Sequence, residues 1–252
     1  MAAFLVLIIY YGSPPVYAAL AAILAVIGLY EYFSMLSHSG IGGYPRLAYV
    51  WGASLILCVY LGDFYMPWAV TGFCALFIAP IISGSEIKDA MRQIAGTLLG
   101  VIYVAGPLGF LLAIVTLEGG RFWLFFLFFI IWCGDIGAYY VGKNFGKRLL
   151  APTVSPGKTV AGAVGGIIGS LAGGLGAWAW FLPGISLAHC LLVIIICGII
   201  GQFGDLAESI LKRSAGVKDS GSLIPGHGGI LDRIDSLMFA GPVFYIYHAA
   251  FL

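Results

Sequence analysis

Long apolar runs, separated by short breaks rich in Gly, Pro and charged residues, cover almost the whole chain. A helix that crosses a bilayer needs about 20 predominantly apolar residues, and several of the runs reach that length. The pattern therefore predicts about eight or nine helices. The candidate spans are residues 2–11, 15–36, 47–62, 68–83, 88–117, 121–142, 159–182, 186–211 and 233–252.

The run 88–117 is longer than one span requires and contains the sequence "AGPLG". The pattern leaves open whether it forms one long kinked helix or two short helices. The runs lack the alternation of a membrane β-barrel, and a backbone in lipid must satisfy its own hydrogen bonds. The expected fold class is therefore all-α, a polytopic integral membrane protein.

Composition agrees with this fold class. Hydrophobic residues make up 61% of the chain and charged residues 9%, with a mean hydropathy of +1.04, whereas soluble domains carry roughly 25% charged residues. The net charge of +1 gives no reason to expect a nucleic-acid partner. The five cysteines lie in apolar runs without a CxxC pair, as expected of buried thiols that form neither disulfides nor a metal site.

Basic residues gather in two linkers, and two predicted spans lie between these linkers. Both linkers must then face the same side of the membrane, and the excess of Lys and Arg indicates that this side is the cytoplasm. We expect a multi-pass protein of the cell (inner) membrane. The basic residues are Lys143, Lys147, Arg148 and Lys158 in the first linker, and Lys212, Arg213, Lys218 and Arg233 in the second.

Glycines recur at spacings of four in "AGAVGGIIGSLAGG", as Gly162/Gly166, Gly165/Gly169 and Gly169/Gly173. Small residues at this spacing let membrane helices approach closely. The stretch predicts tight helix packing, either within the chain or between subunits.

Acidic residues occur where the last two spans meet the membrane surface. Asp205, Glu208 and Ser209 share one helical face with Lys212, and Asp232 and Asp235 open the final span. One helix leaves the membrane and the next enters it, so we expect Asp205 and Asp232 at the same level of an antiparallel hairpin. Carboxylates at low dielectric repel unless a cation or proton lies between them.

Mg²⁺ fits such a pair, because it commonly binds through one or two carboxylates plus substrate phosphates. The alternative is that the acids only form ion pairs, Asp205 with Lys212 and Asp232 with Arg233. The sequence also leaves two roles open for Asp135, in "FFIIWCGDIGAYYVGKNFG". It is either a carboxylate of the site or a partner of Lys143 or of a neighbouring helix.

Five basic side chains are expected on the same side as these carboxylates. Ammonium and guanidinium groups are the counter-charges that a polyphosphate requires. Metal ligands and basic groups together at a membrane surface indicate phosphoryl-transfer chemistry on a lipid. The five are Lys158, Lys212, Arg213, Lys218 and Arg233.

The sequence "PTVSPGKT" is similar to the end of a P-loop, but Pro152 stands where the motif needs Gly and no strand is predicted before it. Lys158 and Thr159, at the start of the next helix, could still hold an anionic group. His227 in "PGHGG" is either a loop residue that approaches a phosphate or base, or a solvated residue of a flexible turn.

Residues 209–235 resemble the signature of the phosphatidate cytidylyltransferase family, the CDP-diacylglycerol synthases. That signature runs Ser-x-apolar-Lys-Arg, Lys-Asp, Pro-x-His-Gly-Gly and Asp-Arg-x-Asp. The segments "GDIGAYYVGKNFGK", "SPGKTVAG" and "GDLAESILKR" are also similar to the family, whereas the N-terminal spans match only in being hydrophobic. The signature positions are Ser209, Leu211, Lys212, Arg213, Lys218, Asp219, Pro225, His227, Gly228, Gly229, Asp232, Arg233 and Asp235.

The resemblance implies that CTP and phosphatidic acid react to give CDP-diacylglycerol and pyrophosphate, a step of phospholipid biosynthesis. It implies dependence on Mg²⁺, with a second cation left open, a site that opens to the cytoplasm, and a homodimer. It also divides the chain into variable N-terminal helices, residues 1–118, and a catalytic region, residues 119–252.

The resemblance further implies roles for individual residues. Asp205 and Asp232 would hold the metal, with Glu208 as a weaker candidate. Lys218 and Arg233 would join the two aspartates as catalytic residues. The expected substrate-binding residues are Ser155, Lys158, Thr159, Ser209, Lys212, Arg213, Asp219, His227 and Asp235.

Three alternatives stay open from the residues. The first is a cytidylyltransferase that acts on an ether-linked archaeal lipid, and the second is a CTP-dependent polyprenol kinase. The third is an ion-coupled transporter, a class of protein that also uses intramembrane carboxylates. A CDP-alcohol phosphatidyltransferase is disfavoured, because its Asp-Gly-x-x-Ala-Arg element has no counterpart in the chain.

Overall fold

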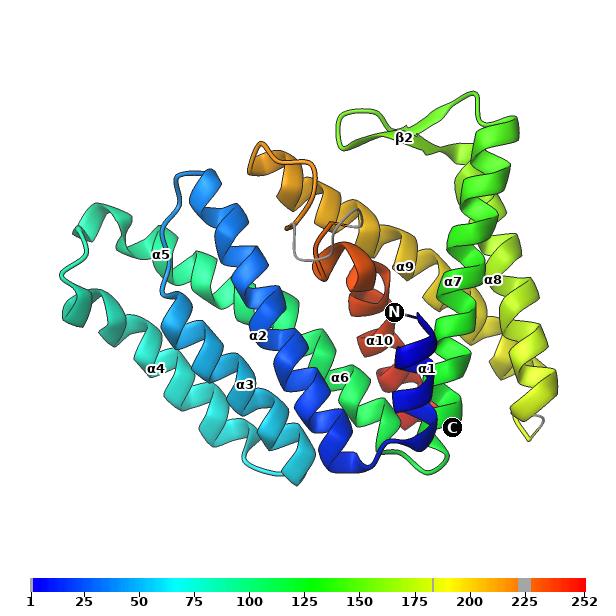
Figure 1. Ribbon diagram of the computed structural model, residues 1–252, viewed down its shortest axis with the longest axis horizontal. Helices are drawn as coiled ribbons and strands as arrows, with labels where there is room; N and C mark the ends of the chain where they lie inside the picture. The colour runs from blue at the N-terminus through cyan, green and yellow to red at the C-terminus, as the bar shows by residue number, and fades with distance from the viewer. Residues whose placement is uncertain (1, 183, 222–227) are drawn as a thin grey trace. The chain divides into compact units, whose positions relative to one another are not determined.

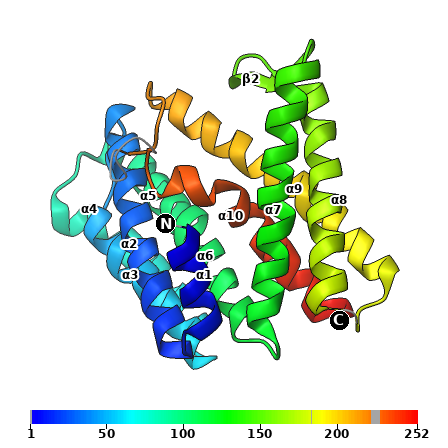
Figure 2. The ribbon, with the colours of Figure 1, turned by 45° about the vertical axis from the view of Figure 1, so that its right-hand side comes forward.

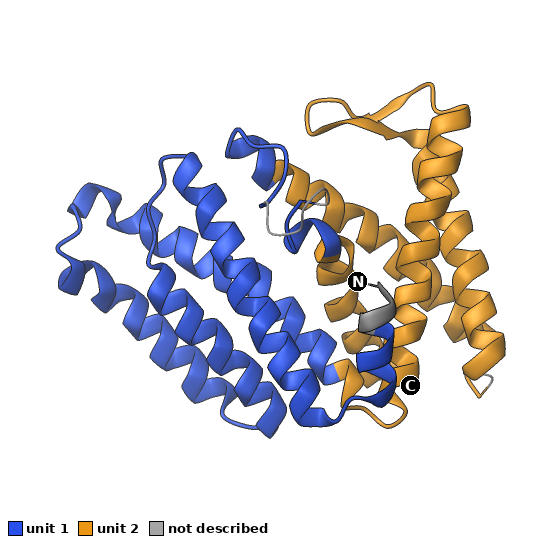
Figure 3. Ribbon diagram, viewed as in Figure 1, with its two compact units in different colours: residues 1–113, 211–233 blue, residues 114–210, 234–252 orange. Residues whose placement is uncertain are grey.

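The structure is a computed structural model that describes residues 2–182, 184–221 and 228–252 (Figure 1). Most of the described residues lie in helices, as the apolar runs predict. The chain divides into two compact units, and Figure 3 shows them in separate colours. Unit 1 comprises residues 1–113 and 211–233, and unit 2 comprises residues 114–210 and 234–252.

Unit 1 is built mainly from the N-terminal helices. Its central pair is α2 and α3, which pack against each other; Gly52 of α3 brings that helix close to the side chain of Leu29 of α2. Two indoles join α3 to α4: Trp51 Nε1 donates to the carbonyl of Trp68 at 3.2 Å, and Trp68 Nε1 donates to the carbonyl of Trp51 at 2.9 Å. The helices are α1 (Ala2–Tyr11), α2 (Pro14–His38), α3 (Pro45–Leu61), α4 (Tyr65–Ser83), α5 (Ile87–Gly100) and α6 (Gly106–Val115).

A π-helical turn, η1 (Val101–Ala105), joins α5 to α6 without a break. The N–H of Gly106 donates to the carbonyl of Val101, five residues back, directly before Pro107, which has no N–H to donate. The open question about the run 88–117 is thereby answered. It is one continuous helical stretch with a π-turn where the sequence contains "AGPLG".

Unit 2 contains the other helices and the only sheet that the described residues form. Its elements are α7 (Gly120–Phe145), β1 (Leu149–Ala151), β2 (Ser155–Thr159), α8 (Val160–Phe181), α9 (Leu187–Ser214) and α10 (Leu231–Phe251), of which α9 and α10 extend into unit 1. The long helices α7 and α8 lie side by side (Figures 1 and 2). Helix α9 follows α8 in the chain.

The glycine-rich face of α8 packs against α7. A Cβ on Gly169 would lie 2.2 Å from the carbonyl oxygen of Cys133, and one on Gly165 would lie 2.8 Å from the carbonyl oxygen of Gly137. Side chains at these positions would push the two backbones apart, so the glycines permit the contact. The close packing predicted from the glycine spacing therefore occurs within the chain.

The hairpin β1–β2 corrects one expectation. No strand was expected before "SPGKT", but β1 precedes it and pairs antiparallel with β2, with Leu149 opposite Thr159. Lys158 and Thr159 consequently lie at the end of β2, and Thr159 caps α8: its Oγ1 accepts a hydrogen bond from the N–H of Gly162 at 3.0 Å. Pro152 still excludes a P-loop.

Every run predicted as a span coincides with a helix, but the count of eight or nine spans is not confirmed. In the described part of the chain, six helical stretches are long and apolar enough to cross a membrane, and Pro45–Leu61 is a shorter apolar helix. The protein is a multi-pass membrane protein. The six stretches are Pro14–His38, Tyr65–Ser83, Ile87–Val115, Gly120–Phe145, Val160–Phe181 and Leu187–Ser214.

Candidate active site

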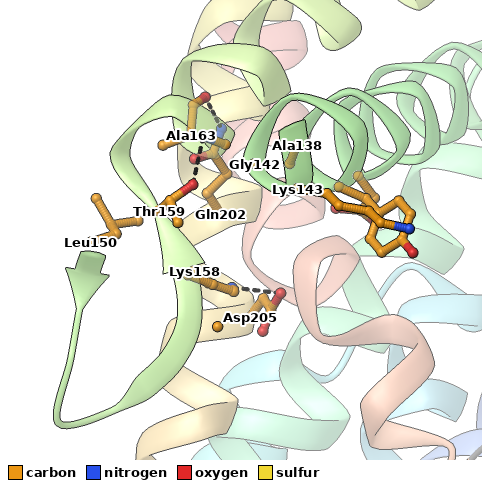
Figure 4. A pocket seen from close by; sticks show the side chains of 13 residues that line it. Ala138, Gly142, Lys143, Leu150, Lys158, Thr159, Ala163, Gln202 and Asp205 are labelled. Atoms are coloured by element: carbon orange, nitrogen blue, oxygen red, sulfur yellow. Dashed lines mark hydrogen bonds and ion pairs between the residues drawn. The ribbon is translucent and has the colours of Figure 1, made fainter. Parts of the chain in front are cut away.

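A cavity of about 390 Å³ opens in unit 2, where α7, the hairpin, α8 and α9 come together (Figure 4). It lies beside the end of α7 and the start of α8, and α9 contributes two polar side chains to it. The lining residues are Asp135, Ala138, Tyr139, Gly142 and Lys143 of α7, Leu150 of β1, Gly157, Lys158 and Thr159 of β2, Gly162 and Ala163 of α8, and Gln202 and Asp205 of α9.

An ion pair joins two of the predicted site residues in this cavity. The ammonium Nζ of Lys158 lies 2.5 Å from Oδ2 of Asp205, and Figure 4 shows the pair between β2 and α9. The side chains remain 26% and 36% exposed, respectively. The base that faces Asp205 is therefore Lys158, supplied by the hairpin that the sequence did not predict.

Asp135 lies in the same cavity as Lys158 and Asp205, and its role as a site carboxylate stays a prediction. It is an exposed residue of α7 that lines the cavity with Asp205 and interacts electrostatically with both Asp205 and Lys158. Lys143 also lines the cavity, where its ammonium lies 5.7 Å from the centroid of the Tyr139 ring. Two carboxylates and two ammonium groups thus surround one space.

The polar wall of the cavity is held by hydrogen bonds between elements. Gln202 Nε2 of α9 donates to the carbonyl of Ala163 of α8 at 3.1 Å. Thr159 uses its hydroxyl to cap α8, beside Gly142 and Gly146 at the end of α7. Ser155 lies at the other end of β2, opposite Ala151, and is not among the described residues that line the cavity.

Unit 1 contains a second cluster of predicted residues, centred on Asp232 in the first turn of α10. Lys212 Nζ donates to Oδ1 of Asp232 at 2.5 Å. Oδ2 accepts from the N–H of Ser220 at 2.9 Å, from the hydroxyl of Ser220 at 2.8 Å and from the N–H of Gly229 at 2.8 Å. The Asp232 side chain is only 8% exposed, so nearly all of its hydrogen-bonding capacity is met by the protein.

These contacts set the charge of Asp232. Burial raises the pKa of this carboxyl group, but the hydrogen bonds from Lys212, Gly229 and Ser220 together lower the pKa below its ordinary value. Asp232 is therefore ionised at neutral pH. The base next to it is Lys212, whereas the ion-pair interpretation of the sequence had assigned Arg233.

The other predicted residues lie around these two clusters. In unit 1, Lys218, Asp219 and Arg233 are exposed, and Arg213 Nη1 donates to the carbonyl of Val217 at 3.1 Å. In unit 2, Glu208 and Ser209 are buried, and Asp235 Oδ1 accepts from the N–H of Ser236 at 2.7 Å. None of these residues lines the cavity in unit 2. His227 lies outside the described residues.

A close contact between α9 and α10 lies directly beside Asp205. A Cβ on Gly204 would lie 2.5 Å from the carbonyl oxygen of Asp235, so the two helices meet within unit 2 at this glycine. The predicted ion shared by Asp205 and Asp232 would join a residue of unit 2 to a residue of unit 1. That arrangement stays a prediction.

Comparison with known proteins adds a family to this geometry. The cytidylyltransferase family matches residues 1–251 of the chain. The chain belongs to the cytidylyltransferase family.

Individual relatives agree with this membership. The chain is 35% identical over 263 residues to a phosphatidate cytidylyltransferase of Synechocystis, covering 92% of this chain and 87% of the relative. It is 45% identical over 162 residues to a protein of that name from Staphylococcus saprophyticus, covering 64% of this chain and 62% of the relative. A Bacillus subtilis protein of the same name is 43% identical over 155 residues, covering 61% of this chain and 57% of the relative.

The donor chemistry of this cytidylyltransferase-family site fits Mg²⁺. Asp135 and Asp205 present hard carboxylate oxygens to one cavity, and such oxygens are the ligands that Mg²⁺ prefers. No group of three or more His, Cys, Asp or Glu side chains among the described residues could hold a metal ion. An ion would therefore depend on one or two carboxylates together with oxygens of the substrate.

Proposed function

We propose that this protein is a phosphatidate cytidylyltransferase, which transfers CMP from CTP to phosphatidic acid and releases pyrophosphate. The observation that carries the proposal is the cavity in which Lys158 meets Asp205 beside Asp135. It combines the charges that two anionic substrates and a divalent ion require, in a chain with helices long enough to cross a membrane. The signature in residues 209–235 and the names of the relatives support the same reaction.

The reaction joins two phosphates. An oxygen of the phosphatidic acid phosphate forms a bond to the α-phosphorus of CTP, and the bond from that phosphorus to the oxygen bridging to the β-phosphate breaks. Pyrophosphate leaves with the electron pair. The attacking phosphate is already an anion and needs no strong base, so the protein contributes positioning and charge stabilisation. The residues proposed to contact phosphates are Lys158, Lys212, Arg213, Lys218 and Arg233.

Asp205 and Asp232 are the residues proposed to hold Mg²⁺, because the family resemblance of the segments that contain them implies this role. When bound, Mg²⁺ reduces the repulsion between the anionic substrates and stabilises the leaving pyrophosphate. Glu208 is fully buried, which makes it the weaker candidate. A second cation is compatible with the additional carboxylate of Asp135.

Each proposed ligand is paired with a lysine in the protein alone, Asp205 with Lys158 and Asp232 with Lys212. An ammonium group can exchange a carboxylate for a phosphate, because both are anions that accept its hydrogen bonds. The lysines thus neutralise the two aspartates before substrate binds. In this proposal, each lysine would move to a phosphate when CTP binds, which would leave its aspartate able to hold the cation.

The site is proposed to face the cytoplasm. The support is the accumulation of Lys and Arg in the linkers on this side of the membrane, two of which, Lys143 and Lys158, line the cavity. A homodimer is the assembly that the family resemblance implies. Its mass in detergent, measured by light scattering, tests this part of the proposal.

The deciding experiment supplies the purified protein with CTP and phosphatidic acid. Pyrophosphate should form only when both are present, and label in the cytidine of CTP should enter the lipid. Label that enters only from the γ-phosphate would indicate a kinase instead, and turnover of an ether-linked lipid alone would indicate the archaeal activity. Flux of an ion or solute into liposomes without pyrophosphate release would indicate a transporter.

The metal assignment has its own test. Asp232→Asn should abolish turnover and leave a folded, membrane-inserted protein. Asp63→Asn is the matched control, because Asp63 is an exposed carboxylate between α3 and α4 and should retain full activity. Retained turnover of Asp232→Asn at saturating Mg²⁺ would refute the assignment.

A further inference from the structure

Glu31 is an acidic residue near the end of α2, a helix that is otherwise almost wholly apolar. Its side chain is only 2% exposed. An ionised carboxylate is costly to bury unless it is hydrogen-bonded, so hydrogen-bond donors are expected around Glu31. Its hydrogen-bond partners Ser220, Ile230 and Leu231 belong to unit 1, as Glu31 does.

The carboxylate of Glu31 binds the start of α10. Oε1 accepts a hydrogen bond from the N–H of Ile230 at 2.8 Å, and Oε2 accepts one from the N–H of Leu231 at 2.9 Å. The first N–H groups of a helix have no acceptor within the helix, and the positive end of the helix dipole lies there. Glu31 therefore caps α10 from a helix about 200 residues earlier in the chain.

Glu31 also contacts the residue that binds Asp232. The hydroxyl of Ser220 lies 3.2 Å from Oε2 of Glu31 and 2.8 Å from Oδ2 of Asp232. Ser220 is itself buried, with 3% of its surface exposed. A hydroxyl has a single proton to donate, so Ser220 shares that proton between the two carboxylates, and the shorter contact is with Asp232.

Two glycines of the signature segment make room for this carboxylate. A Cβ on Gly221 would lie 2.9 Å from Oε1 of Glu31, and one on Gly229 would lie 2.4 Å from Oε2. The N–H of Gly229 is also a donor to Asp232. The segment is thus shaped around Glu31, and two of the residues beside Glu31, Ser220 and Gly229, bind Oδ2 of Asp232.

We propose that Glu31 is a positioning residue of the active site. By fixing Ser220 and the first turn of α10, it commits Oδ2 of Asp232 to the protein and leaves Oδ1, the oxygen next to Lys212, for the cation. This inference rests on the proposed role of Asp232 as a metal ligand. It assigns a functional part to the N-terminal helices, which the sequence signature does not include.

The test uses Glu31→Gln in the full-length protein. The amide keeps the shape of the side chain but replaces one acceptor oxygen with a donor, so Ile230 or Leu231 loses its acceptor. Loss of a residue that orients a metal ligand typically costs about 10–100-fold in metal affinity or activity. We expect Mn²⁺ binding to the CTP-bound protein, followed by electron paramagnetic resonance, to weaken by about 10-fold or more. The kcat should fall by a similar factor, with an unchanged KM for phosphatidic acid.

Met35→Ala is the matched control, because Met35 is buried on the same helix one turn further on. It should lower the thermal midpoint at least as much as Glu31→Gln but leave Mn²⁺ affinity unchanged. Ser220→Ala should weaken Mn²⁺ binding less than Glu31→Gln, and the double variant should be no weaker than Glu31→Gln alone, because both changes act on Asp232.

Two results separate the failure of this inference from that of the proposed function. If Asp232→Asn loses Mn²⁺ binding while Glu31→Gln keeps the affinity of the unmodified protein, Glu31 has no positioning role and the metal assignment stands. If Asp232→Asn also binds Mn²⁺ normally, the metal assignment fails and the inference fails with it. Equal weakening in Met35→Ala would show that Glu31 matters only for stability.

Discussion

Lys158 and Asp205 form an ion pair in the lining of the cavity in unit 2, with Nζ 2.5 Å from Oδ2. The pair joins a β-hairpin to α9, and both side chains keep about a quarter to a third of their surface exposed. Ion pairs with this degree of exposure contribute about 0.2–1 kcal/mol. An interaction of this size is compatible with the proposed exchange, in which Asp205 would bind a cation and Lys158 a phosphate.

Replacing Lys158 with Met should have opposite effects on the two ligands. Asp205 loses a competing positive charge, so Mn²⁺ should bind the substrate-free protein up to about fivefold more tightly, which corresponds to about 1 kcal/mol. CTP loses a charged hydrogen-bond donor, so its KM should rise about 10-fold or more. Metal titration and steady-state kinetics measure the two effects.

The matched control for this prediction is Lys147→Met. Lys147 is an exposed lysine just after α7 and is not among the residues that line the cavity. It should leave both Mn²⁺ affinity and the KM for CTP unchanged. An unaltered KM in Lys158→Met would mean that this lysine only neutralises Asp205.

Replacing Asp135 with Asn should separate a catalytic role from a structural role. The two carboxylates in the cavity repel each other, so removal of one charge should leave the thermal midpoint unchanged or slightly higher. If Asp135 helps to bind a cation, kcat should nevertheless fall about 10–100-fold. Pyrophosphate release measures kcat, and thermal unfolding in detergent measures stability. Asp63→Asn is the control, because Asp63 is an exposed carboxylate outside the cavity. A fall in stability with unchanged kcat would show that Asp135 is a structural ion-pair partner.

The helices could be predicted from the sequence because lipid leaves the backbone few alternatives. The run 15–36, for example, corresponds to α2 (Pro14–His38) with small differences at its ends. The hairpin β1–β2 could not be predicted in this way. It lies between α7 and α8, where hydropathy gives no periodic signal, and its strands have only three and five residues.

The site was only partly predictable, because ion pairs depend on how the helices pack. Lys158 and Asp205 were both expected in the site, but their direct contact requires the hairpin. The place of Asp135 in the cavity depends on how α7 packs with the hairpin and α9. Glu31 had a signal that the sequence interpretation did not use: an acid within an apolar span is by default a candidate functional residue. Its partners, however, lie up to 200 positions away.

The packing of α7 against α8 gives a further prediction, because it positions both Asp135 and Lys158. In Gly169→Ala the new Cβ would lie 2.2 Å from the carbonyl oxygen of Cys133, and that oxygen is backbone and cannot rotate away. Overpacking of this kind costs about 1–3 kcal/mol. The thermal midpoint should fall, and pyrophosphate release should fall even below the unfolding temperature, because the two helices must separate.

Gly176→Ala is the matched control on the same helix. Nothing lies within 4 Å of a Cβ built at Gly176, and Ala is favoured over Gly in a helix by about 1 kcal/mol. This variant should therefore be at least as stable as the unmodified protein and fully active. If both alanine variants unfolded at the same temperature, the glycines of α8 would not be holding α7 in place. The position of Asp135 beside Lys158 would then need another explanation.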